Sequence, residues 1–416
     1  MAQSSEWSGI APYYRREVPV ELHRHNAARV KTRKGHVAPL GLLNTSGQYA
    51  SVSLCAYFVQ AGQTSWRRCS TSIFWRAPTA IGDHPRRKAY RARAGRRHRE
   101  VSASRSGAVA VVGGYGTALI FEVARAPGSG ETVLARSMVT DHGGKGSNQA
   151  VAARRLGANV SLLTAVGHDG FGEMGRWLWA DEGIDVTGVV TGELPTMTGA
   201  ILVEEGGDNR IVVAMGALGE LTLADVDAFA GHIAAADVCA VSLEIPAEVA
   251  ARALQLAKRE GTLALLNPAP PVELPDEVLR DVDVIVPNRS EAEVMTASAP
   301  GTPPEALLDG LRERTSARVV LTLGVDGALV DDGTSRVKVD AVRTSRVVDT
   351  TGAGDAFTGA LATALAKGLD LFPAVEVATA CAGISVGTAS VIPSLPRLAD
   401  LPAPIRERVT AATAAR

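Results

Sequence analysis

The sequence of 416 residues predicts an α/β fold in which a parallel β-sheet is covered by helices on both faces. Three observations support this prediction. From residue 108 onward, short apolar runs are continuous rather than alternating, which is typical of strands buried on both faces. Segments with helical periodicity separate these runs, as the connections between parallel strands require. The charged residues are also divided so unevenly along the chain that the first 105 residues stand apart from the rest.

The division of charge falls near Arg105. Residues 1–105 hold 19 Lys and Arg and 5 Asp and Glu, a net charge of +14, whereas residues 106–416 hold 24 and 39, a net charge of −15. Apolar residues before Arg105 follow no sustained helical or strand period. We therefore expect residues 1–105 to be a basic, Arg-rich extension that is disordered or results from a start codon assigned too far upstream. A nucleic-acid-binding arm and an organelle-targeting segment are the alternatives for this stretch.

Composition and spacing exclude several other classes of protein. No apolar run approaches the roughly 18 residues of a membrane-spanning helix, and no secretory signal pattern follows Met1. The cysteines have no CxxC spacing, so the sequence suggests neither a zinc site nor a disulfide framework. A reduced, cytoplasmic location is therefore expected. The four cysteines are Cys55, Cys69, Cys239 and Cys381.

The predicted domain, residues 106–416, contains regularly alternating elements. Thr222, with Asp225 three residues later, resembles a capping box that opens a helix reaching about Ala235. Continuous apolar strands are predicted at residues 109–112, 160–165, 238–243, 263–266, 282–286 and 319–323. Helices are predicted after the second strand as far as Glu182, at residues 247–260, and near the end of the chain at residues 354–368 and 373–385.

One segment interrupts this alternation. Residues 200–203 and 210–213 flank a turn at residues 205–209 that is rich in glycine and polar residues. The pattern predicts a hairpin-like insertion that could form a small β lid.

The stretch at residues 347–357 is the most informative for chemistry. Gly352, Ala353 and Gly354 precede a strong helix-forming run, so their backbone N–H groups can point together at an anion. Asp355 stands just inside the first turn, where like charge would oppose simple phosphate binding. A carboxylate there can instead take the proton of a hydroxyl that attacks a phosphoryl group. The alternative is an aspartate that only stabilises the helix dipole.

A second glycine-rich stretch covers residues 143–150 and leads into a helix. Its order and spacing differ from those of the G-x-x-x-x-G-K-[ST] phosphate loop. The glycines let the backbone approach a ligand closely, and Lys145 and Asn148 could donate hydrogen bonds to sugar hydroxyls. The alternative is a glycine turn followed by a polar helix cap.

Two further stretches follow predicted strands. Asn288 and Glu291, three residues apart, can share the first turn of a helix and face a hydrated Mg²⁺, or they can simply cap that helix. Thr322, Gly324 and Gly327 belong to a glycine turn at another strand end, and this turn is ambiguous when taken alone.

Taken together and in this order, these stretches resemble the ribokinase family of carbohydrate kinases, the phosphofructokinase-B-type sugar kinases. The resemblance runs from about Val109 to Leu398. It implies a ribokinase-like, Rossmann-like three-layer domain with a small β-sheet lid, formed by segments about 115–142 and 196–216 and often used for dimerisation. It also implies ATP-dependent phosphorylation of a sugar's primary hydroxyl, with Mg²⁺ and an activating K⁺. Among such sugars the resemblance favours D-ribose, which would give D-ribose 5-phosphate.

The resemblance assigns roles to individual positions. Asp355 is implied to be the general base, with Gly352, Ala353 and Gly354 forming the anion hole. Sugar contacts are implied for Gly144, Lys145, Asn148, Glu244 and Asp355. Nucleotide contacts are implied for Asn288, Thr322, Gly324, Gly327, Gly354 and Thr379. Glu291 matches the motif linked to Mg²⁺, and the positions surrounding K⁺ are Asp349, Thr351, Ser385, Thr388, Ser390 and Ser394.

One stretch departs from the family's pattern. After the first strand, ribokinases carry Gly-Ser-x-Asn-x-Asp, whose Asn and Asp hold ribose hydroxyls. Here Gly116 replaces the Asn and Ala118 replaces the Asp, so neither position offers a polar side chain to the sugar. This replacement should alter or weaken ribose binding and leave phosphoryl transfer intact. Tyr115, between the replaced positions and the strand, is a candidate to stack on a different substrate.

Two alternatives to a ribose kinase stay open. The first is a kinase of the same family that acts on another sugar or on a nucleoside, because a fold does not determine the substrate. The second is a non-catalytic ligand-binding relative, against which the retained Asp355 and glycine-rich anion hole argue. Expected partners are ATP, a small sugar and a second copy of the chain through the lid. Neither a membrane nor nucleic acid is an expected partner.

Overall fold

The structure, a computed structural model, describes residues 106–344 and 346–414. The predictions for the basic extension at residues 1–105, and those for Cys55 and Cys69, lie outside the described residues. None of the helices in the described ranges is both long enough and apolar enough to cross a membrane.

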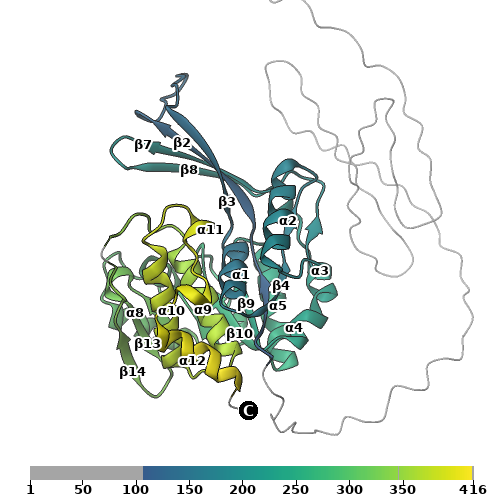
Figure 1. The fold of residues 1–416 in the computed structure, drawn as a ribbon, viewed down its shortest axis with the longest axis vertical. Helices are drawn as coiled ribbons and strands as arrows, with labels where there is room; N and C mark the ends of the chain where they lie inside the picture. Colours follow the sequence, from purple (N-terminus) through teal and green to yellow (C-terminus); the bar gives the residue numbers. More distant parts are fainter. Residues whose placement is uncertain (1–105, 345, 415–416) are drawn as a thin grey trace, which may run out of the picture. The chain divides into compact units, whose positions relative to one another are not determined.

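An eight-stranded sheet forms the centre of the described domain (Figure 1), in the order β14-β13-β12-β11-β10-β9-β1-β4. The strands from β12 to β4 run parallel, whereas β13 and β14 pair antiparallel at one edge. The predicted parallel sheet is therefore confirmed, with two antiparallel edge strands added. The strands are β1 (Ala108–Val112), β4 (Asn159–Leu163), β9 (Val238–Ser242), β10 (Leu263–Asn267), β11 (Val284–Ile285), β12 (Arg318–Thr322), β13 (Ala328–Asp331) and β14 (Arg336–Val339).

Helices cover both faces of this sheet, and each face has its own apolar core. Within β1, Val109 and Val111 pack into one core, and Ala110 and Val112 pack into the other. The first core holds side chains of α1 (Lys145–Arg155), α2 (Gly170–Glu182), α9 (Ala353–Ala366), α10 (Leu371–Ser385), α11 (Val391–Ser394) and α12 (Ala403–Ala414). The second holds those of α3 (Leu223–Ala228), α4 (Ala230–Ala235), α5 (Ala247–Glu260), α6 (Asp276–Leu279), α7 (Arg289–Met295) and α8 (Pro304–Arg314).

A separate four-stranded sheet rises above the domain in Figure 1, in the order β3-β2-β7-β8. It is the small β-sheet that the sequence predicts, and it contains the expected hairpin. Two of its strands are connected directly to elements of the larger sheet's domain, since β2 follows β1 and β3 leads into α1. Its strands are β2 (Gly116–Val123), β3 (Ser137–Gly143), β7 (Thr198–Glu204) and β8 (Asn209–Ala214).

Three predicted elements differ in detail from the structure. The strand expected at residues 160–165 ends at Leu163, and β5 (Ala165–Val166) then pairs with β6 (Val190–Thr191) in a two-stranded sheet. The helix that opens at the Thr222 capping box is two helices, α3 and α4, which meet at Phe229. The strand expected at residues 282–286 shortens to β11, of which two residues pair with β10.

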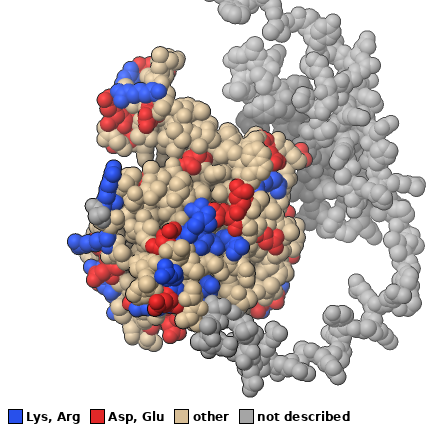
Figure 2. Space-filling model, viewed as in Figure 1, with Lys and Arg blue, Asp and Glu red and all other residues tan. Residues whose placement is uncertain are grey.

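Charged side chains of both signs are interspersed on the face of the described domain that Figure 2 shows. Surface ion pairs of the described domain include Arg125 with Glu131 in the loop between β2 and β3, and Arg210 with Glu204 on the small sheet. Such exposed pairs contribute little to stability. An anion that binds to this face would therefore have to be held by local features rather than by a broad basic surface.

Candidate functional site

The candidate site lies where the chain leaves the carboxyl end of β1 and enters α1. An ideal Cβ placed on Gly146, in the first turn of α1, would stand 2.5 Å from the carbonyl carbon of Gly113. A Cβ on Gly113 would in turn stand 2.9 Å from Cα of Gly146. Glycine at both positions therefore allows the two backbones to touch. This contact fixes the start of α1 against the end of β1, which is where ligands bind in open α/β sheets.

Asp355 is held by two amide side chains of α1. Its Oδ2 accepts a hydrogen bond from Nδ2 of Asn148 at 2.8 Å, and its Oδ1 accepts one from Nε2 of Gln149 at 3.1 Å. Gln149 Nε2 also donates to Oδ1 of Asn267 at 3.0 Å, and Asn267 donates to the Val286 carbonyl at 2.9 Å. Asp355 is 6% exposed. Its orientation is therefore determined by hydrogen bonds that reach from α1 to the ends of β10 and β11.

Lys145 gathers three carboxylates from distant parts of the chain. The pKa of its ammonium is raised, chiefly by the charge of Asp355 and also by those of Glu244 and Glu291. The backbone N–H of Lys145 donates to Oε2 of Glu244 at 2.6 Å. The structure thus brings together four charged residues that are far apart in the sequence. Such a cluster offers both hydrogen-bond donors and acceptors to a polar substrate. The four residues are Lys145, Glu244, Glu291 and Asp355.

Burial raises the pKa of Glu244 to about 7, although Lys145 partly offsets this effect. In the folded chain this carboxyl keeps a proton at pH values where an ordinary glutamate in the unfolded chain, with a pKa of 4.5, has lost it. The folded state then binds more protons than the unfolded state in this window, so its stability declines as the pH rises.

We expect the unfolding free energy of the chain to fall by up to about 3 kcal/mol between pH 4.5 and pH 7 through this group. Denaturant titrations across this range should show the decline, and Glu244→Gln should remove it. Glu248→Gln, which changes an exposed glutamate four residues later, is the matched control and should keep it. An equal slope in Glu244→Gln and the unchanged chain would show that Glu244 does not titrate in this way.

The start of α9 lies beside α11. Gly352 caps the helix with a φ of 81°, and an ideal Cβ there would stand 2.6 Å from Cγ1 of Val391. A Cβ on Gly354 would meet nothing within 4 Å. Gly352 is thus tightly packed against Val391, whereas the space next to Gly354 is open. An anion could approach the N–H groups of this first turn from that open side.

The pair Asn288 and Glu291 forms the helix cap that spacing alone favours. Oδ1 of Asn288 accepts the N–H of Glu291 at 2.9 Å, and the Glu291 carboxylate accepts the backbone N–H and the side-chain amide of Asn288 at 2.8 and 2.7 Å. Asn288 also bridges to Thr322 at the end of β12. Beyond Thr322, Gly324 and Gly327 have positive φ values of 59° and 85° in a tight turn. These four predicted nucleotide-contact positions therefore lie along one edge of the sheet.

The positions implied to surround K⁺ are brought together in part. The two carboxylate oxygens of Asp349 accept the N–H groups of Thr351 at 2.9 Å and Ser390 at 3.2 Å. The backbone of Asp349 reaches the end of α10 through Val386, near Ser385 and Thr388. The hydroxyls of Ser385, Ser394 and Thr379 instead bond to carbonyls of their own helices, those of Ala382, Val391 and Glu376.

Tyr115 does not stack on a substrate, and this expectation from the sequence is wrong. Its ring is fully buried, packs edge-on against Trp179 with centroids 4.9 Å apart, and places its hydroxyl 3.1 Å from the Phe171 carbonyl. An ideal Cβ on Gly175 would lie 2.6 Å from the Tyr115 ring. Tyr115 is therefore part of the core under α2.

Gly116 is closely covered by Met197. An ideal Cβ at Gly116 would stand 2.5 Å from Cε and 2.7 Å from the carbonyl oxygen of Met197. Replacing this glycine with asparagine would therefore require the backbone at Met197, just before β7, to move. The absence of a polar side chain at position 116 is built into the packing of the small sheet.

Three polar residues of this region had no predicted role. Gln149 and Asn267 bond to each other and hold Asp355, and Ser242 ends β9 beside Gly113. Oδ1 of Asn148, Oε1 of Gln149 and Oγ of Ser242 are buried without a hydrogen-bond partner in the described residues. A polar side chain next to predicted site residues, or at the end of an otherwise apolar strand, is the signal that would have found them. Buried polar atoms that lack partners are expected where a ligand binds.

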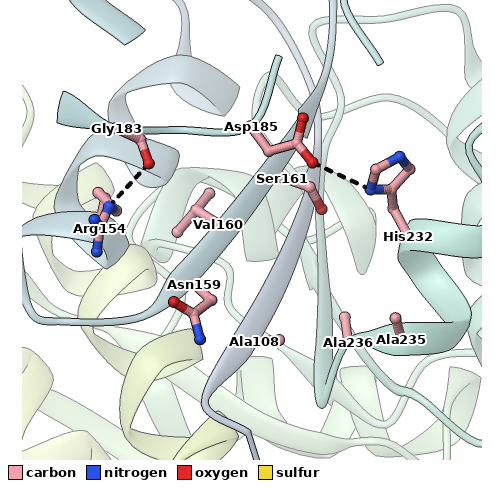
Figure 3. A pocket seen from close by; sticks show the side chains of 10 residues that line it. All are labelled: Ala108, Arg154, Asn159, Val160, Ser161, Gly183, Asp185, His232, Ala235 and Ala236. Atoms are coloured by element: carbon pink, nitrogen blue, oxygen red, sulfur yellow. Dashed lines mark hydrogen bonds and ion pairs between the residues drawn. The ribbon is translucent and has the colours of Figure 1, made fainter. Parts of the chain in front are cut away.

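A cavity of about 310 Å³ lies elsewhere, at the opposite end of the sheet (Figure 3). Its lining includes Ala108 and Asn159, which begin β1 and β4, and Asp185, which pairs with His232 at 3.6 Å. Because the predicted catalytic residues follow the carboxyl ends of the strands, this cavity is separate from the candidate site.

Comparison with known protein families gives one match over most of the domain. Residues 108–398 match the pfkB family carbohydrate kinase model. The ribokinase of Schizosaccharomyces pombe is 36% identical over 307 residues, which cover 69% of this chain and 95% of that protein. The deoxyribokinase of Salmonella typhimurium is 34% identical over 296 residues, covering 69% and 96%.

Solved structures show the same similarity. A ribokinase from Thermotoga maritima is 30% identical with a TM-score of 0.65, covering 73% of this chain and 98% of the other. The ribokinase of Arabidopsis thaliana complexed with ribose and ATP is 25% identical with a TM-score of 0.66, covering 74% and 98%.

Proposed function

This chain belongs to the pfkB family of carbohydrate kinases and is an ATP-dependent sugar kinase, and from that premise we propose that it phosphorylates D-ribose at its primary hydroxyl. Relatives named ribokinases, at 32–37% identity, support this substrate. The observation that carries the proposal is the placement of Asp355 at the start of α9. There it is fixed by Asn148 and Gln149 and lies within the electrostatic reach of Lys145.

In the proposed reaction Asp355 is the general base. Its carboxylate takes the proton of the sugar's primary hydroxyl, and the hydroxyl oxygen forms a bond to the γ-phosphorus of ATP. The bond between that phosphorus and the oxygen bridging to the β-phosphate breaks, so ADP leaves and the proton passes from Asp355 to solvent. Asn148 and Gln149 aim the carboxylate, because each of its oxygens accepts a hydrogen bond from one of them.

The first turn of α9 supplies the anion hole of this proposal. The N–H groups after Gly352, with the positive end of a 14-residue helix behind them, face the charge that develops on the transferring phosphoryl group. The open space in front of Gly354 gives the phosphoryl group access to these donors. Asn288, Thr322, Gly324, Gly327 and Thr379 are proposed to contact the nucleotide.

The proposed sugar contacts come from the start of α1 and the end of β9. The ammonium of Lys145 and the amide of Asn148 can donate to hydroxyls, and Gly144, with a φ of 91°, lets the backbone approach the sugar. Glu244 is proposed to accept a hydroxyl while its Oε2 holds the N–H of Lys145.

The residues present fit a magnesium ion that is carried mainly by ATP. Both carboxylate oxygens of Glu291 are already bonded to Asn288, and the described residues include no group of three or more His, Cys, Asp or Glu that could hold a metal. Mg²⁺ commonly keeps several waters and binds substrate phosphates with few protein ligands. Glu291 would hold such an ion through water, and the ion would neutralise phosphate charge.

An activating K⁺ is proposed next to the start of α9. Asp349 links Thr351 to Ser390, whose φ of 66° is unusual for a residue other than glycine. The hydroxyls of Ser385 and Ser394 donate their protons to carbonyls of their own helices. Those residues and Thr388 are proposed to offer backbone carbonyls to the ion. Such an ion would add positive charge beside the anion hole.

A second candidate substrate is 2-deoxy-D-ribose, or another sugar or nucleoside with fewer hydroxyls at this position. Met197 fills the space beside Gly116, and Ala118 carries no polar group, so β2 itself offers no polar side chain to a hydroxyl here. The similarity to a deoxyribokinase agrees with this candidate.

We also propose that the chain forms a homodimer through the small sheet and works in the cytoplasm. Strand β8 is exposed along its whole length and lies at the sheet edge, where unpaired backbone groups can pair with a second copy. Ile211, Val212 and Val213 are 58, 69 and 51% exposed, so dimerisation would bury apolar area.

The cysteine pattern supports the proposed cytoplasmic location, because it suggests a reducing compartment.

A substrate panel tests the proposed function. The full chain, supplied with MgATP and K⁺, should release ADP with D-ribose or 2-deoxy-D-ribose at a kcat/KM at least tenfold above that with hexoses or nucleosides, because hydrogen bonds to hydroxyls set specificity. ADP release can be followed with a coupled assay. A strong preference for a nucleoside or a hexose would refute the pentose assignment and leave the kinase assignment in place.

A further inference from the structure

The strands β2 and β3 pair in a register that separates two faces of the small sheet. Thr117 stands directly opposite His142, and Ala118 stands directly opposite Asp141. Directly opposite residues of an antiparallel pair project from the same face with their Cβ atoms about 5 Å apart, and successive residues alternate between faces. One face therefore carries Thr117 and His142, and the other carries Ala118 and Asp141.

The face that carries Thr117 and His142 is covered by side chains of the described domain. The Tyr115 hydroxyl lies 3.3 Å from Nδ1 of His142, and the Tyr115 ring packs on Trp179 of α2. Thr117 is 2% exposed. This face thus looks toward α2, so Ala118 and Asp141 project from the opposite face.

The face of Ala118 and Asp141 continues into the proposed sugar site. Gly116 shares it with Ala118 and faces Met197, while an ideal Cβ on Gly114 would stand 2.6 Å from Oε2 of Glu244. The surface therefore leads from Glu244 past Met197 to Ala118. On the neighbouring strand, Asp141 is three residues from Gly144, and Figure 1 shows β3 descending to α1.

Asp141 is half-buried, and only one of its two carboxylate oxygens accepts a hydrogen bond within the described residues. Its Oδ1 accepts the N–H of His142 at 2.8 Å, and within the described residues its Oδ2 has no hydrogen-bond or ion-pair partner. An acceptor held on a strand beside the substrate, with one oxygen unoccupied, is suited to a sugar hydroxyl.

We propose that Asp141 is a substrate-binding residue whose carboxylate anchors sugar hydroxyls in place of the aspartate that the family's pattern puts at position 118. The anchor has moved across the sheet, from β2 to the directly opposite position on β3. This inference rests on the proposed sugar-kinase function. Asp141 supplies the polar group that Gly116 and Ala118 do not carry, so the carboxylate that anchors the sugar comes from β3 rather than from β2.

The test uses the full chain with D-ribose and 2-deoxy-D-ribose as probes. In Asp141→Ala we expect the KM for the better of these sugars to rise about 10- to 100-fold, because a hydrogen bond to a charged group is removed. The KM for ATP should change less than twofold. Calorimetric titration of the sugar without ATP should show the same weakening. Asp208→Ala, which removes an exposed aspartate from the turn between β7 and β8, is the matched control and should leave both constants unchanged.

A relocation variant provides the sharper test. Moving the carboxylate back, as Ala118→Asp combined with Asp141→Ala, should recover at least fivefold of the sugar affinity that Asp141→Ala removes. An unchanged KM for sugar in a folded Asp141→Ala chain would overturn the inference and leave the kinase function intact. If that variant does not fold, the nearly isosteric Asp141→Asn decides, with the same expected direction. A full chain that phosphorylates no sugar would overturn the proposed function and this inference together.

Discussion

Asp355→Asn is expected to lower kcat by about 10²- to 10⁴-fold, the usual contribution of a general base. Asparagine has the same shape but cannot accept the hydroxyl proton. The fold should tolerate the change, because one of the two amides that now donate to Asp355 can rotate. Oδ1 of Asn148 is buried without a partner in the described residues, so Asn148 can turn to accept from the new amide. Gln149 keeps its orientation, because its Nε2 also donates to Asn267.

The comparison needs kcat, ATP affinity and melting temperature for both chains. ATP affinity and melting temperature should stay close to those of the unchanged chain. Asp370→Asn is a matched control, since Asp370 is exposed before α10 and makes no side-chain cap. It should retain full turnover. If Asp355→Asn kept more than a tenth of the original kcat, Asp355 would not be the base.

Gly352→Ala should damage both stability and catalysis. Left-handed backbone geometry costs a residue other than glycine about 1–2 kcal/mol. The added Cβ would also stand only 2.6 Å from Cγ1 of Val391. We expect a loss of about 2 kcal/mol or more in unfolding free energy. Displacement of the first turn of α9 should also lower kcat by about 10²- to 10³-fold, as the loss of one anion-hole donor does.

Gly354→Ala separates these two effects. A Cβ at Gly354 meets nothing within 4 Å and the residue is already helical, so the unfolding free energy should be maintained or slightly increased. The methyl group would stand in the space assigned to the phosphoryl group, so kcat/KM for ATP should still fall. Denaturant titration and steady-state kinetics on both variants measure the difference. Equal stability of Gly352→Ala and the unchanged chain would contradict the packing against Val391.

Much of the fold follows from local patterns. Continuous apolar runs predict β1, β9, β10 and β12, and the period of α5 predicts its bounds at Ala247–Glu260. The breaks were not predictable, because they depend on tertiary partners. β4 ends at Leu163 since the next residues pair with β6. Phe229 divides α3 from α4, and its side chain is buried in the second core.

The sequence pointed to candidate residues for the site and said less about their geometry. Glycines and charged residues indicated Asp355, Lys145 and Glu291, and the family resemblance added Glu244. The structure places these four residues within one electrostatic neighbourhood. Spacing could not show that Gln149 bridges Asp355 to Asn267, because those residues are far apart in the chain. It also could not show that Tyr115 is buried, since one aromatic residue beside glycines is compatible with either location.

The separation of the two sheets has a consequence for how such an enzyme can change over evolutionary time. The residues proposed to act in phosphoryl transfer lie on α1 and α9. These two helices are in close contact, because an ideal Cβ on Gly359 of α9 would stand 2.6 Å from Cβ of Ala152 in α1. This contact leaves little room for substitutions. Those proposed to choose the sugar lie partly at the start of α1 and after β9, and partly on β2 and β3. Mutations in these strands can therefore explore new substrates while the reaction itself is inherited intact.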